Sequence, residues 1–82
     1  MINEIIERYE DNVFIKFEGF DEAIIGVYDK NSNVKLIYSE KKCINILSNT
    51  MSQEDAYEYF YYNVVNMYLG EQTPIICFDN FS

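Results

Sequence analysis

Two spacings of apolar residues alternate along the chain, and each spacing predicts a different kind of element. Over residues 2–9 the apolar side chains recur every three or four positions, which predicts a short amphipathic helix. Over residues 13–17 they recur every second position among β-branched and aromatic residues, which favours a strand. The amino-terminal part of the chain is therefore expected to form a helix followed by a strand.

The middle of the chain carries the clearest hairpin signal. Two β-rich runs, residues 23–28 and 34–38, flank the polar turn formers DKNSN. Gly26 interrupts the first run, and a glycine inside a strand is typical of a bulge or of a close approach by another backbone. A further β-rich run, PIICF at residues 74–78, predicts a last short strand.

Two helices are predicted between the hairpin and the last strand. Ser39 is a suitable amino-terminal cap for a helix over residues 40–47. Ser52 is a suitable cap for a longer helix, which the pattern extends to about Leu69. Gly70 follows directly, and glycine favours the left-handed conformation that ends many helices.

Together these elements predict one α+β domain that spans residues 1–82. The predicted order is α-β-β-β-α-α-β, with a mainly antiparallel sheet of about four strands that helices cover on one face. A chain of this length buries a single core, which leaves no room for a separate catalytic domain.

The longer predicted helix holds five tyrosines and one phenylalanine. At 100° per residue, one stripe faces the sheet: Ala56, Tyr59, Phe60, Asn63 and Met67. A buried Asn63 would need hydrogen-bond partners, in the loop GEQTP or on a neighbouring strand. The adjacent stripe holds Tyr57, Tyr61, Val64 and Tyr68. Val64 is predicted to join Tyr59, Phe60 and Met67 in the core, and the three tyrosines are predicted to reach the preceding helix. The remaining side presents Glu58 and Tyr62 as its most exposed pair, and surplus tyrosines indicate a contact surface for another protein.

Composition narrows the range of functions. The chain has no histidine, which excludes Ser-His-Asp and Cys-His catalysis and nearly all zinc sites. Cys43 and Cys77 belong to no CxxC motif and are expected to be buried thiols. Phosphate-loop, dinucleotide-binding and EF-hand motifs are absent. We therefore predict a protein that is not an enzyme, with no catalytic residue, no cofactor and no metal site.

The charge of the chain indicates what it binds. Its net charge is −8, which repels the phosphates of nucleic acids and attracts a basic protein partner instead. Residues 1–29 carry eight acidic and two basic side chains, an asymmetry that favours either an interaction face or a solvated surface that aids solubility. The predicted partner-binding residues lie in this acidic segment and on the tyrosine-rich helix: Glu18, Asp21, Glu22, Glu58 and Tyr62. The sequence leaves open which of the two regions makes the contact.

The length of the apolar runs also indicates whether the protein is expected to enter a membrane. The longest of them, such as AIIGVY and PIICF, are much shorter than the roughly 20 residues that a membrane-spanning helix needs. The first residues carry acids where a signal peptide would carry bases. We expect no membrane association and a location in the cytoplasm.

The segment MSQEDAYEYFYYNVVNMYLGEQTPI, with FDEAIIGVY and LIYS upstream, resembles a family of small proteins of phages, prophages and other mobile elements. The resemblance covers residues 20–78, and its most specific positions lie in and just after the tyrosine-rich helix: Glu54, Ala56, Glu58, Tyr59, Phe60, Asn63, Tyr68, Gly70, Thr73 and Pro74. It implies a phage-related origin, with the host cytoplasm as the location, and lends no catalytic residues.

A small, acidic, histidine-free protein of this kind is similar to anti-CRISPR and other anti-defence inhibitors. That similarity implies a DNA-mimic or steric inhibitor of a host defence nuclease. The alternative is an immunity protein or antitoxin that neutralises a toxin carried on the same element. Both would present the same kind of surface to a basic partner, so the sequence does not separate them.

Overall fold

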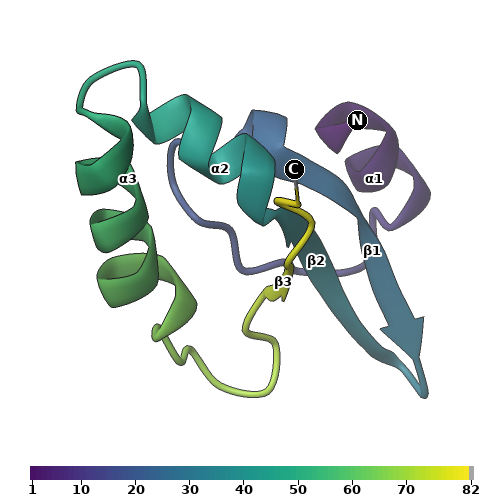
Figure 1. The fold of residues 1–82 in the computed structure, drawn as a ribbon. Helices are drawn as coiled ribbons and strands as arrows, with labels where there is room; N and C mark the ends of the chain where they lie inside the picture. The colour runs from purple at the N-terminus through teal and green to yellow at the C-terminus, as the bar shows by residue number, and fades with distance from the viewer. Residues whose placement is uncertain (82) are drawn as a thin grey trace.

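The computed structural model describes residues 1–81, which form a small α+β fold of three helices and one three-stranded sheet (Figure 1). The helices are α1 (Ile2–Arg8), α2 (Glu40–Leu47) and α3 (Gln53–Phe60), and α3 continues directly into the π-helical turn η2 (Tyr61–Val65). The strands are β1 (Ile24–Lys30), β2 (Asn33–Ser39) and β3 (Ile75–Cys77), and the 3-10 turn η1 (Asp21–Ala23) leads into β1. The α+β class predicted from the sequence is confirmed.

The sheet has one strand fewer than predicted, and its pairing is mixed. Its order is β1-β2-β3, with β1 antiparallel to β2 and β3 parallel to β2. The parallel pair arises because the chain leaves the end of β2, runs through α2 and α3, and returns to start β3 beside β2. A long crossover of this kind is the connection that parallel neighbours require.

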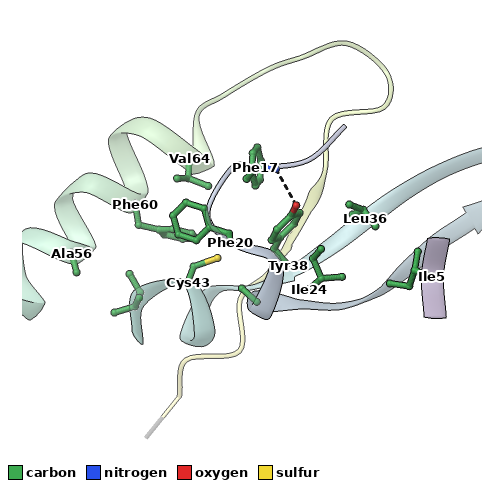
Figure 2. Packing of buried hydrophobic residues seen from close by; sticks show 12 residues of the cluster. Ile5, Phe17, Phe20, Ile24, Leu36, Tyr38, Cys43, Ala56, Phe60 and Val64 are labelled. Atoms are coloured by element: carbon green, nitrogen blue, oxygen red, sulfur yellow. Dashed lines mark hydrogen bonds between the residues drawn. The ribbon is translucent and has the colours of Figure 1, made fainter. Parts of the chain in front are cut away.

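Residues 13–17 do not form the predicted strand. This segment crosses between α1 and η1 (Figure 1), and its backbone is held by a side chain, because the Phe17 N–H donates to the Tyr38 hydroxyl at 3.0 Å (Figure 2). Phe17 is buried while Val13 is 81 % exposed. Phe14, from the opposite phase of the alternation, packs against the core, so the alternation predicted neither the strand nor which side chains are buried.

The hairpin between β1 and β2 matches the prediction closely. Asn31 and Ser32 both take positive φ values, 54° and 65°, between the paired residues Lys30 and Asn33. Two central residues of this conformation form the tight turn whose twist suits neighbouring antiparallel strands. The register shifts between Ile24 and Gly26, which confirms the bulge that the glycine predicts.

The core is a single cluster to which the sheet and all three helices contribute (Figure 2). Its buried members include Ile24, Leu36 and Tyr38 from the strands, Ile5 from α1, Cys43 and Ile44 from α2, Ala56, Phe60 and Val64 from α3 and η2, and Phe17 and Phe20 from the segment between α1 and η1. Tyr38 is fully buried, and its hydroxyl accepts a hydrogen bond from the Phe17 N–H, so the buried oxygen has a partner.

The π-helical turn changes the direction of the side chains that follow Phe60. Ala56, Phe60 and Val64 are buried as predicted. The hydrogen bonds of a π-helix join residues five apart, so each turn takes in more residues than an α-helical turn. Ala56, Phe60 and Val64 are four residues apart and share one face, and the widened turn rotates Asn63 further from that face than an α-helical turn would.

Three members of the predicted core stripe are exposed. Tyr59 is 44 % exposed, Met67 is 41 % exposed, and Asn63 is also on the surface. The Asn63 Nδ2 donates to the Tyr59 carbonyl at 3.2 Å, so its partner is its own helix. The prediction that a loop or strand would satisfy a buried Asn63 is wrong, because the widened turn removes Asn63 from the core.

The helical segment also ends earlier than predicted, at Val65, with Asn66 as its cap. Gly70 does take a left-handed conformation, with a φ of 98°, but in a separate turn. Thr73 closes that turn: its hydroxyl accepts the Leu69 N–H at 2.7 Å and donates to the Gly70 carbonyl at 2.6 Å. The conformation predicted for the glycine is right, and its role as the end of the helix is wrong.

The buried stripe gives a first testable expectation. Phe60→Ala should lower the free energy of unfolding by about 3 to 5 kcal/mol, because it leaves a cavity where a fully buried ring was. Tyr62→Ala is the matched control: its ring is 72 % exposed, so the change should stay within about 0.5 kcal/mol. Denaturant unfolding measures both, and equal losses would contradict the assigned orientation of α3.

Candidate protein-binding surface

The outer side of α3 and η2 carries an open depression, which we call the α3 depression. It is lined by Met51, Asp55, Glu58, Tyr59, Tyr62 and Asn63. The predicted contact residues Glu58 and Tyr62 both belong to it, and Tyr62 is 72 % exposed. Their predicted exposure is therefore confirmed, and their contact with a partner stays a prediction.

Sequence reasoning missed the other residues of the α3 depression. Asp55, Glu58, Tyr59 and Tyr62 follow one another at steps of three, one and three residues, the spacing of a single helical face. This signal was present in the sequence. It was obscured because the longer predicted helix placed Tyr59 and Asn63 on the core stripe.

Two other tyrosines anchor the opposite flank of α3. The Tyr61 hydroxyl donates to the Glu40 carboxylate at the start of α2, and the Tyr57 hydroxyl accepts from the Asn80 amide. The hydrogen bond to buried Glu40 raises the pKa of Tyr61 to about 12. Of the flank predicted to reach the second helix, Tyr61 does so, Tyr57 meets the carboxyl-terminal segment, and Tyr68 is 78 % exposed. These bonds hold α3 so that the α3 depression faces outward.

The negative charge of α3 has no positive counterpart nearby in the chain. Glu54, Asp55 and Glu58 lie on α3, and no lysine or arginine follows Lys42 anywhere in the sequence. Within residues 1–81 the single ion pair joins Lys16 Nζ to Asp21 Oδ2 at 3.1 Å. The carboxylates of the α3 depression are therefore available to an external cation.

The acidic residues predicted near the amino terminus lie around η1. Glu18, Asp21 and Glu22 line a second open depression together with Ile46 and Asn49, which come from α2 and the turn after it. Asp21 is partly neutralised by Lys16, and its Oδ1 has no hydrogen-bond partner within residues 1–81. The structure thus brings these three predicted residues together, but with less free negative charge than their number implies.

The five predicted contact residues form two neighbouring groups. Asn49 lines the depression around η1, and Met51 lines the α3 depression. Both residues belong to the short turn between α2 and α3 (Figure 1), so the two depressions share this turn in their lining. The structure places Glu58 and Tyr62 in one depression and Glu18, Asp21 and Glu22 in the other.

The cysteines belong to neither depression. Cys43 is fully buried, and desolvation raises the pKa of its thiol to about 12, so it is protonated and unreactive at neutral pH. Cys77 is half-buried in β3, which corrects the expectation that both thiols are fully buried. Within residues 1–81 there is no group of three or more His, Cys, Asp or Glu side chains that could hold a metal ion.

Comparisons with protein-family models, with curated proteins and with solved structures gave no match. The resemblance to small phage proteins therefore stays a prediction. In the described part of the chain, no helix has the length and apolar character needed to cross a membrane.

The carboxyl-terminal segment is fastened to the start of α2. Asp79 Oδ2 accepts from the Ser39 hydroxyl at 2.6 Å, and Asp79 Oδ1 accepts from the Lys41 N–H at 3.0 Å. Partial desolvation raises the pKa of Asp79, but these hydrogen bonds outweigh it and the net pKa is lowered. Because the neighbouring Asn80 binds Tyr57, this segment links α2 to α3.

This link predicts a stability that depends on pH. Asp79→Ala should lower the free energy of unfolding by about 1 to 2 kcal/mol at pH 7, as the loss of a helix cap does. The pKa of Asp79 is lowered in the folded protein. The extra free energy of unfolding of the wild type over Asp79→Ala is therefore fully present above the ordinary carboxyl pKa, and it is lost as the pH falls through the lowered pKa of the folded protein. Urea unfolding of both proteins at neutral and acidic pH measures this, with exposed Glu71→Ala as the control. A difference that persisted undiminished in acid would contradict the role of the carboxylate.

Proposed function

We propose that this protein binds a basic partner protein through the α3 depression and inhibits it. The observation that carries the proposal is the combination of free carboxylates and exposed tyrosine rings in one depression. Asp55 and Glu58 supply the charge, and Tyr59 and Tyr62 supply the aromatic area. Tyrosine at the centre of an interface contributes much of the binding free energy, while surrounding charges steer association.

The α3 depression is favoured over the depression around η1 for two reasons. Its carboxylates have no ion-pair partner within residues 1–81, whereas Asp21 already pairs with Lys16. It also combines acids with two large exposed rings, whereas the apolar component of the η1 depression is Ile46. We therefore assign Glu58 and Tyr62 to the centre of the contact and treat Glu18 and Glu22 as secondary.

A nuclease is the partner whose chemistry fits best. A nuclease needs a basic channel to hold nucleic-acid phosphates, and carboxylates placed in that channel compete with the phosphates. The net charge of −8 and the resemblance to small phage proteins support a host defence nuclease as the target. The protein would then act as a DNA-mimic or steric inhibitor.

Phage challenge of cells that carry individual defence systems tests this function. Expression of the protein should restore plaque formation against at least one nuclease-based system. Tyr62→Ala should weaken binding to that purified nuclease about tenfold, because it removes a large exposed ring from the centre of the contact. Calorimetric titration of the two purified proteins measures the loss.

The matched control is Tyr68→Ala, which removes an equally exposed tyrosine outside the α3 depression and should leave affinity unchanged. Wild-type affinity in Tyr62→Ala, or a lack of protection against every system, would overturn the proposal. Rescue of growth from a toxin encoded beside the gene, without any protection against phage, would favour the immunity or antitoxin function instead.

A further inference from the structure

We propose that the α3 depression recognises arginine in preference to lysine on the partner protein. This inference rests on the proposed function and adds the chemical identity of the contacted side chain. It depends on two features of the depression, which are the polarity of its hydrogen-bonding groups and the shape of its aromatic side chains.

The charged groups that line the depression are all acceptors. The carboxylates of Asp55 and Glu58 accept hydrogen bonds only, the tyrosine hydroxyls can accept as well as donate, and one of the two Nδ2 hydrogens of Asn63 is already used by the Tyr59 carbonyl. A phosphate or carboxylate ligand would be repelled by such a set. A cation with several N–H donors matches it, and guanidinium offers five donors where ammonium offers three.

The aromatic side chains select between the two cations. Tyr59 and Tyr62 are three residues apart on one helical face, beside Glu58, and they are 44 % and 72 % exposed. A planar guanidinium can lie on a tyrosine ring while its N–H groups point to the adjacent carboxylate. The compact, strongly hydrated ammonium of lysine gains less from the same rings. Arginine therefore uses both features of the depression, and lysine uses mainly the charge.

Labelled nona-arginine and nona-lysine peptides, titrated with the full-length protein and followed by fluorescence anisotropy, provide the test. The arginine peptide should bind about three- to fivefold more tightly. Tyr62→Ala should remove most of this preference, and Tyr62→Phe should retain it because the ring remains. Glu58→Gln should weaken both peptides to a similar extent.

Glu71→Gln is the control for charge alone, because it removes one exposed carboxylate that does not line the depression. Equal affinity for the two peptides, with Glu58→Gln weaker than Glu71→Gln, would overturn the arginine preference and leave the basic-partner function standing. If Glu58→Gln and Glu71→Gln were indistinguishable, attraction would come from net charge alone, and both proposals would be overturned.

Discussion

The burial of Phe60 in the central cluster is the constraint on which the rest of the surface depends. Its ring is fully buried, and Ala56 and Val64 continue the same stripe one turn before and after it. Fixing this stripe fixes the direction of every other side chain on α3 and η2. The free energy gained by burying these groups is a large part of the stability of a small domain, so rotation of α3 away from the core would unfold much of the protein.

The polar contacts on the flank of α3 complete this arrangement. Tyr61 reaches the buried Glu40, and Tyr57 meets Asn80, whose neighbour Asp79 caps α2. Two of the five tyrosines in this part of the chain thus have a structural role, since their rings join α3 and η2 to α2 and to the carboxyl-terminal segment. Tyr59 and Tyr62 point outward and line the α3 depression together with the carboxylates of Asp55 and Glu58. No lysine or arginine follows Lys42 in the sequence. Tyr59 and Tyr62 are the residues for which a partner supplies the simplest explanation.

Local signals in the sequence were sufficient for the hairpin, for its bulge at Gly26, and for the caps Ser39 and Ser52, because each depends on neighbouring residues only. The missing strand at residues 13–17 and the parallel direction of β3 depend on tertiary pairing, which a pattern of side-chain burial does not encode. The π-helical turn has no sequence signature of its own, so the exposure of Asn63 was not predicted, and the buried stripe is also narrower than predicted because Tyr59 is exposed before the turn begins. Glu58 and Tyr62 were found because they lie on the side that an α-helix and a π-turn both leave exposed.

Site-resolved nitration of the tyrosines, read by mass spectrometry, tests the division of α3 most directly. Nitration attacks accessible phenols through their ionised form, so both exposure and pKa control it. Tyr62 should react rapidly, Tyr61 slowly because its pKa is raised to about 12 by Glu40, and Tyr38 only after unfolding. Protection of Tyr62 in the folded protein, or reaction of Tyr61 as fast as Tyr62, would contradict the account.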